Sequence, residues 1–258
     1  MSRSAVSRLG IVCLAILAGG LLVGAERAAQ VQAAGLGDVH DMGHMRMTKL
    51  RPLQPGDRER AATIAAAARK AAEPYLDYRK ALADGYKIFL PDVPQHVYHF
   101  TRNDHALTAM RRFDPEKPTS LLYEKTPASE QADGKPGYSL LGVMYTDRYR
   151  APEDELNQRV PLSFAQWHLH TDLCLPPGNE LSNIDSPDAK FGLRGSITTQ
   201  AACEAAGGRF LPHVFGWMVH VYPFETDPAK IWSSGMDDDH GMQHDAMPGM
   251  KMDLKTKM

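Results

Sequence analysis

The sequence has no apolar run long enough for a typical membrane span. Its longest run covers residues 9–23, about fifteen residues, whereas a spanning helix needs about 20. Basic residues Arg3 and Arg8 precede the run and small residues follow it, an order typical of a secretory signal peptide. We expect cleavage after Ala25 or Ala33 and a periplasmic or secreted mature protein. If the protein is attached to a membrane at all, we expect the attachment to be an uncleaved leader.

Cysteine is also scarce. The chain contains three, and Cys13 lies inside the leader, which leaves Cys174 and Cys203. An even pair in an exported protein indicates a disulfide, and closing this loop would stabilise the fold by about 3–4 kcal/mol. The alternative is that Cys174, close to His168 and His170, is a thiolate ligand for a metal.

The chain has no large excess of charge of either sign: its net charge is −2, and it has no basic run. A nucleic-acid partner is therefore not expected. The sequence also lacks H-E-x-x-H, G-x-S-x-G, a glycine-rich phosphate loop and C-x-x-C. These absences exclude zincin-type metalloproteases, serine hydrolases, nucleotide-binding proteins and thioredoxin-like proteins.

Methionine and histidine, by contrast, are concentrated in two polar segments that hold nine of the 13 methionines. Methionine normally fills gaps in a hydrophobic core, but these segments have no apolar periodicity. Thioethers suit Cu(I), and imidazole suits copper or zinc. The candidate metal ligands in these segments are His40, Met42, His44, Met45 and Met47 near the N-terminus, and Met236, His240, Met242, His244, Met247, Met250 and Met252 near the C-terminus.

The two segments resemble the Met/His-rich segments of exported bacterial copper-handling proteins, in His40-Asp41-Met42-Gly43-His44-Met45 and His240-Gly241-Met242-Gln243-His244. The resemblance covers only these tails, about thirty residues. It implies that the bound metal is copper, and the partners it suggests are the metal ion and an envelope copper transporter or chaperone. It implies nothing about the fold between the tails.

A second candidate site lies in the central part of the chain, at His168-Leu169-His170. In a strand these two imidazoles point to the same face, where they can share one ion. His220 on a later strand is the best third ligand, which would complete a three-histidine site for copper, zinc or iron. His96, His99 or Asp172 could be a fourth ligand or could orient a ligand.

Two metal-free alternatives remain for these histidines. Buried histidines can simply form hydrogen bonds with the backbone and with hydroxyl groups. A histidine can also act as a general base together with Asp172 or Glu204.

The order of helical and strand patterns predicts an α+β fold, with N-terminal helices packed on an antiparallel sheet of four to six strands. Alanine-rich helices are expected from residue 57 to 83. Strands are expected near 95–101, 119–124, 138–146, 161–173 and 214–224. The expected divisions are a signal peptide at 1–25, a flexible Met/His-rich segment at 26–55, one domain at 56–232 and a flexible acidic tail at 233–258.

Together these patterns predict an exported metal-binding protein for copper storage, delivery or tolerance in the periplasm. The alternative is an exported metalloenzyme whose H-x-H site performs redox or hydrolytic chemistry. A third hypothesis is a metal-free structural or interaction domain of the cell envelope.

Overall fold

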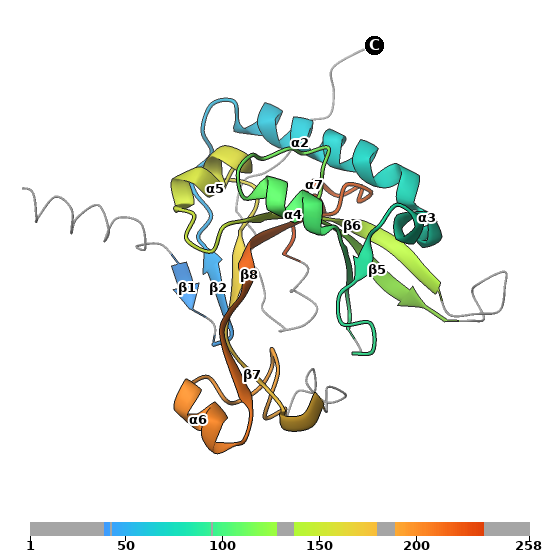
Figure 1. Ribbon diagram of the computed structural model, residues 1–258. Coiled ribbons are helices and arrows are strands. Elements are labelled where there is room, and N and C mark those ends of the chain that lie inside the picture. Colours follow the sequence, from blue (N-terminus) through green and yellow to red (C-terminus); the bar gives the residue numbers. More distant parts are fainter. Residues whose placement is uncertain (1–38, 42, 94, 128–136, 180–188, 235–258) are drawn as a thin grey trace, which may run out of the picture.

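A single antiparallel sheet of eight strands organises the described part of the chain in the computed structural model (Figure 1). The structure describes all residues except 1–38, 42, 94, 128–136, 180–188 and 235–258. The strand order is β1-β2-β7-β8-β6-β5-β4-β3, and every neighbouring pair is antiparallel. The strands are β1 (Val39–Asp41), β2 (Met45–Thr48), β3 (Lys87–Ile88), β4 (Tyr98–Thr101), β5 (Ser120–Thr126), β6 (Gly137–Asp147), β7 (His168–Leu175) and β8 (Arg209–Val221).

Most of the helices form a layer on one side of the sheet, and α6 lies apart at the far ends of β7 and β8 (Figure 1). The α-helices are α2 (Asp57–Ala72), α3 (Tyr78–Ala83), α4 (Asn103–Ala109), α5 (Glu153–Arg159), α6 (Gln200–Ala205) and α7 (Pro228–Ile231). Two short 3₁₀ turns, η1 (Glu73–Tyr75) and η3 (Pro177–Asn179), complete the set. In the described part of the chain, none of the helices has both the length and the apolar character needed to cross a membrane.

Helix α2 forms because alanine has the highest helix propensity and Asp57 fits the first turn. The Asp57 carboxylate accepts hydrogen bonds from Gln54 N (3.0 Å) and Ser163 Oγ (2.6 Å), so it anchors the helix start to the chain before β7. Ala61, Ile64 and Ala68 follow at helical spacing and are buried against the sheet. The helix cap itself is Gly56 in the left-handed region (φ 85°).

The two faces of the sheet carry different side chains because successive residues in a strand alternate. One face holds the main core, in which Tyr123, Val143, Trp167 and Val219 pack beneath the helices. The other face holds the alternate positions of the same strands, including a second cluster of Leu122, Met144, Met218 and Tyr222. The histidines of the central strands lie on this second face.

The predicted α+β class and its antiparallel sheet are confirmed, with two differences in detail. The helices are not confined to the N-terminal part, because α4 to α7 occur between or after strands. The sheet has more strands than expected, because β1 and β2 form within the segment 26–55 that we expected to be flexible. That expectation is wrong for β2, since Met45–Thr48 pairs with β7 and is largely buried.

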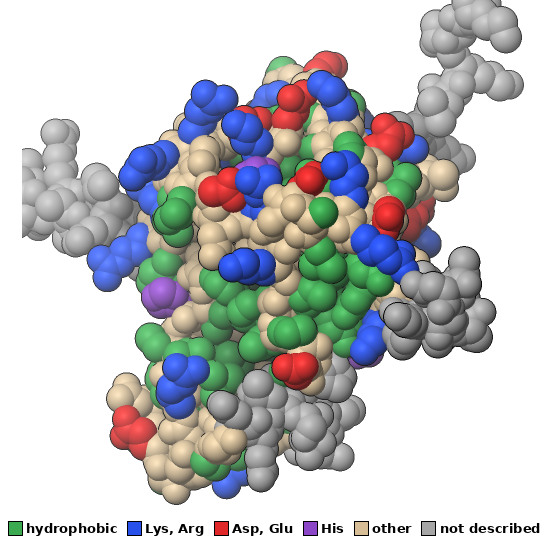
Figure 2. Space-filling model, turned by 45° about the vertical axis from the view of Figure 1, so that its right-hand side comes forward, with side chains coloured by type: hydrophobic (Ala, Val, Ile, Leu, Met, Phe, Trp, Pro, Cys, Tyr) green, Lys and Arg blue, Asp and Glu red, His purple; other side chains and the backbone are tan. Residues whose placement is uncertain are grey.

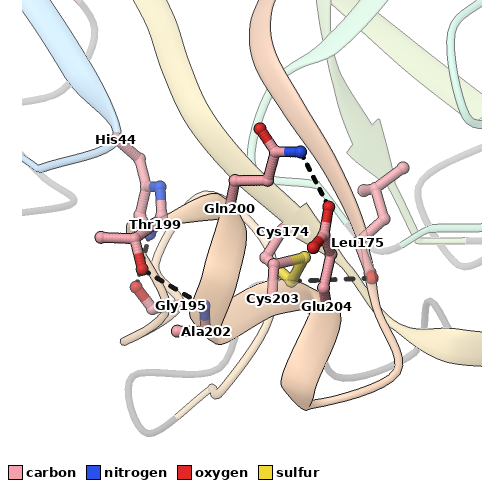
Figure 3. Close-up of a disulfide and its surroundings, with 9 residues drawn as sticks. All are labelled: His44, Cys174, Leu175, Gly195, Thr199, Gln200, Ala202, Cys203 and Glu204. Atoms are coloured by element: carbon pink, nitrogen blue, oxygen red, sulfur yellow. Dashed lines mark hydrogen bonds between the residues drawn. A yellow bond between two sulfur atoms is a disulfide. The ribbon is translucent and has the colours of Figure 1, made fainter.

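The expected disulfide between Cys174 and Cys203 is present (Figure 3). Cys174 lies near the end of β7 and Cys203 on α6, whose N-terminus is capped by the Thr199 hydroxyl. Both sulfurs are buried with Ile197. Cys174 is therefore not a free thiolate, and the metal-ligand alternative for it is excluded in this oxidised state.

Replacing both cysteines by serine should lower the free energy of unfolding by about 3 kcal/mol, because the unfolded chain would no longer be cross-linked. Urea denaturation of the double variant, Cys174→Ser with Cys203→Ser, measures this loss. Reducing agent should destabilise the wild-type protein by a similar amount and leave the variant unchanged. An equal effect of reductant on both proteins would contradict the assignment.

Candidate metal centre

Four imidazole rings form a row on the second face of the sheet. The ring centres of His170 and His168 on β7 are 5.4 Å apart, those of His168 and His220 on β8 are 4.9 Å apart, and those of His220 and His99 on β4 are 5.6 Å apart. The sheet therefore brings together the three histidines predicted as ligands, His168, His170 and His220. It adds His99, which the sequence had left as one of several candidates for a fourth position.

These spacings suit rings that share an ion. With metal–nitrogen bonds of about 2 Å, two imidazoles on one tetrahedral ion have their ring centres about 5 Å apart. Within the described residues, however, no three side chains of His, Cys, Asp or Glu already form a complete ligand set. An ion bound here can also use a donor of another type beside the imidazoles.

Methionine sulfur is available as that donor, because the strand register places a methionine directly opposite each imidazole of β7 and β8. His168 lies between Met47 of β2 and Met218 of β8, while His170 faces Met45 and His220 faces Met144. Directly opposed residues in an antiparallel pair share a face, with Cβ atoms about 5 Å apart. All four methionines are buried. We call these residues the His/Met layer: Met45, Met47, His99, Met144, His168, His170, Met218 and His220.

One imidazole of the His/Met layer has its tautomer fixed by the backbone. His220 Nδ1 lies 2.9 Å from the carbonyl oxygen of Ser234, which can only accept, so Nδ1 donates the hydrogen bond. Nε2 then carries the lone pair, and it is buried without a hydrogen-bond partner among the described residues. His168 Nδ1 is likewise buried without a hydrogen-bond partner among the described residues. Histidines that bind a metal through one ring nitrogen are commonly oriented by a hydrogen bond from the other, as His220 is here through Nδ1.

Burial keeps all four imidazoles neutral at neutral pH. It lowers the pKa of His99 and of His170 to about 4 and that of His220 to about 3, and it holds the pKa of His168 well below its usual value. Other imidazoles, among them His99 in each case, lower the pKa values of the three histidines of β7 and β8 further, since each disfavours a second positive charge nearby. A neutral imidazole is the form that binds a metal ion.

Part of the layer is covered by the chain that follows β3. Phe89 contacts Phe215 of β8, with ring centres 5.1 Å apart, although β4, β5 and β6 lie between β3 and β8 in the sheet. The Phe89 side chain therefore reaches over a face of the sheet toward β8, while its backbone N–H still donates to His99 O beside β4. Val97, further along the chain that follows β3, packs on the second cluster with Leu122 and Met144, which identifies that face as the one with the His/Met layer.

The difference between the helical layer and the rest of the molecule is also visible on the surface. Charged side chains gather over the helical layer, and hydrophobic side chains gather between that layer and the α6 end of the molecule (Figure 2). Phe215 is 55% exposed at a bulge in β8, where its φ of 60° is positive and the register with β7 shifts.

His44 is buried near the disulfide and is not in a flexible tail, contrary to the sequence-based expectation. Its Nε2 donates to the carbonyl of Gly195, which lies beside it in Figure 3, at 2.5 Å. The carbonyl of His44 accepts a hydrogen bond from Thr171 N. His44 thus ties the start of β2 to the loop before α6. No ring contact joins it to the row of four imidazoles in the described part of the chain.

Several other predicted ligands lie outside the row or outside the described residues. His40 is in β1 opposite Met47, and nothing is described of its side chain. His96 is exposed, and Asp172 adopts a positive φ of 55°, which breaks the strict alternation after His170. Met42 and the whole C-terminal set lie outside the described residues, namely Met236, His240, Met242, His244, Met247, Met250 and Met252.

Sequence reasoning named Met45 and Met47 as candidate ligands but placed them in a flexible segment, and it did not name Met144 as a ligand. Met144 lies within the expected strand 138–146, so the alternation of side chains fixes its face. It comes to lie opposite a histidine only because β6 pairs with β8. Met45 and Met47 alternate too, but their strand is only four residues long.

Comparisons with known proteins give no relative. No protein-family model matches the chain, and neither the curated proteins nor the solved structures contain a match.

The four neutral imidazoles predict that the metal-free protein loses stability in mild acid. In the unfolded chain they take up protons near pH 6.5, whereas in the folded protein His99, His170 and His220 do so only near pH 4 or below, and the pKa of His168 also lies well below its usual value. Between these pH values the unfolded state binds more protons than the folded state. The free energy of unfolding therefore falls as the pH is lowered, by up to about 1.4 kcal/mol per pH unit for each imidazole. Asp147 acts oppositely, since burial raises its pKa to about 6, but it is one group against four.

Urea denaturation of the metal-free protein at pH 7, 6 and 5, with chelator present, measures this dependence. His168→Phe should make this pH dependence shallower, and His213→Ala is the control, because His213 is exposed and lies outside the His/Met layer. The same slope in all three proteins would show that the imidazoles of the layer are not protected from protonation.

Proposed function

We propose that this protein is an exported copper-binding protein that serves copper storage, delivery or tolerance in the periplasm. Its bound metal is Cu(I), held in the His/Met layer of the central sheet. The Met/His-rich C-terminal segment adds further ligands of the same two types. The partners are the ion itself and an envelope transporter or chaperone that exchanges it.

The observation that carries the proposal is the register that sets methionines opposite histidines on one buried face. Thioether and imidazole together form a soft to borderline ligand set, which suits Cu(I) better than magnesium, calcium or manganese. Methionine also survives in an oxidising compartment, where free cysteine would be oxidised. The disulfide is compatible with such a compartment.

Charge favours a monovalent ion over zinc or iron. Besides burial, the groups that shift the pKa values of the four imidazoles are other imidazoles and the backbone groups of Val97 and Ser234, and no carboxylate is among them in the described part of the chain. A layer of neutral donors leaves the charge of the ion uncompensated. Since the cost of burying charge rises with its square, a divalent ion costs about four times as much as Cu(I).

A metalloenzyme is the second candidate, with zinc or iron at His168, His170 and His220. The convergence of these three rings supports it, and the burial of His168 and His220 weighs against it, because a substrate needs an open position on the metal. Stoichiometric zinc or iron that survives loss of the layer's methionines would favour the enzyme. The metal-free structural domain would bind none of these ions.

Replacing the two methionines that flank His168, as Met47→Leu with Met218→Leu, should weaken Cu(I) binding by about tenfold or more, equivalent to about 1.4 kcal/mol. Leucine preserves the packing volume, so the fold should persist. Competition with a chromophoric Cu(I) chelator measures the affinity, and near-ultraviolet circular dichroism checks the fold.

Met110→Leu is the matched control, because Met110 is 47% exposed and lies outside the layer. It should bind Cu(I) like the wild type. Zinc affinity should be similar in all three proteins, since thioether is a poor ligand for zinc. If the double variant and the control bind Cu(I) equally well, the thioethers of the layer are not ligands and the copper proposal for this face fails.

A further inference from the structure

The row of imidazoles in the His/Met layer is too extended for one ion to use all of it. Ring contacts join His170 to His168, His168 to His220 and His220 to His99. In the described structure no ring contact joins His99 to either histidine of β7, and none joins His170 to His220. One tetrahedral ion, whose ligand rings all lie about 5 Å from one another, cannot take all four.

A neutral imidazole offers only one nitrogen lone pair, so it binds one ion. In His220 that nitrogen is Nε2, because Nδ1 donates to the Ser234 carbonyl. His220 therefore cannot bridge two ions while it keeps this hydrogen bond. Each of the four rings can bind one ion, so the row divides into two pairs of neighbouring rings.

The pairs are His99 with His220 and His168 with His170, with ring centres 5.6 and 5.4 Å apart. Each pair has its own thioethers opposite it in the sheet. Met144 faces His220 across the β6–β8 ladder, while Met47 and Met45 face His168 and His170 across the β2–β7 ladder. A site of two imidazoles with one or two thioethers also agrees with the lack of any complete set of three His, Cys, Asp or Glu ligands in the described residues.

We propose that the His/Met layer binds two Cu(I) ions, one at His99, His220 and Met144 and the other at His168 and His170 with thioethers from Met45, Met47 and Met218. This inference rests on the proposed function and assigns His99 and Met144 as ligands of a second site. Both sites take Cu(I) by ligand exchange without a change of oxidation state. Monovalent ions also limit the repulsion between two neighbouring sites.

The test counts copper in the full-length protein and in variants that each remove one end of the row. His99→Phe and His170→Phe keep a ring of similar size, and each should bind one Cu(I) ion fewer per chain than the wild type. The variant that combines them should bind two fewer. Copper bound by the Met/His-rich segments is the same in all of these proteins, so it cancels in the differences. His213→Ala is the control and should bind as many ions as the wild type.

The competing arrangement is a single ion between His168 and His220, the closest pair of rings. In that case His99→Phe and His170→Phe would both keep the full count, which would overturn the two-ion inference and leave the proposed function standing. Loss of both ions in either single variant would also overturn it, since the sites would not be separate. If His168→Phe loses no copper either, the layer binds none and the proposed function fails as well.

Discussion

The register between β2, β7, β8 and β6 is the constraint on which the rest of the structure depends. It aligns Met47, His168 and Met218 across three strands and Met144 with His220 across the next ladder. The same alternation sends Trp167, Leu169 and Val219 to the opposite face, where they form the core beneath the helices. A shift of one residue in any of these strands would exchange the two faces. The core and the His/Met layer are therefore fixed by one set of backbone hydrogen bonds.

This layer is costly for the metal-free protein. Buried imidazole nitrogens of His168 and His220 lack hydrogen-bond partners among the described residues, and a buried polar atom without a partner costs about 1–3 kcal/mol. A layer of leucine and valine would bury the same area without that cost. An ion that accepts these lone pairs removes the cost, which gives a physical reason for the histidines on this face.

The fold was predictable where the pattern was long and regular. The alternation of His168, Leu169 and His170 placed the two histidines of β7 on one face. The position of His220 beside them depended on the pairing of β7 with β8, which no local pattern encodes. The cysteine pair likewise followed from composition. Four-residue β2 was not predictable, because Met45 and Met47 lie in a segment whose composition resembles a tail and their partners lie more than 100 residues away in the chain. The contribution of His99 depended on the β4–β5–β6–β8 order, which no local pattern encodes.

X-ray absorption spectroscopy of bound copper tests the central claim most directly. The sample is the full chain in which seven of the C-terminal-segment ligands are replaced, histidine by glutamine and methionine by leucine: Met236, His240, Met242, His244, Met247, Met250 and Met252. It is loaded with less than one equivalent of Cu(I). A copper ion in the His/Met layer should show nitrogen and sulfur neighbours together, and the sulfur signal should weaken when Met47 and Met218 are replaced by leucine. Copper surrounded by nitrogen and oxygen alone would contradict the account.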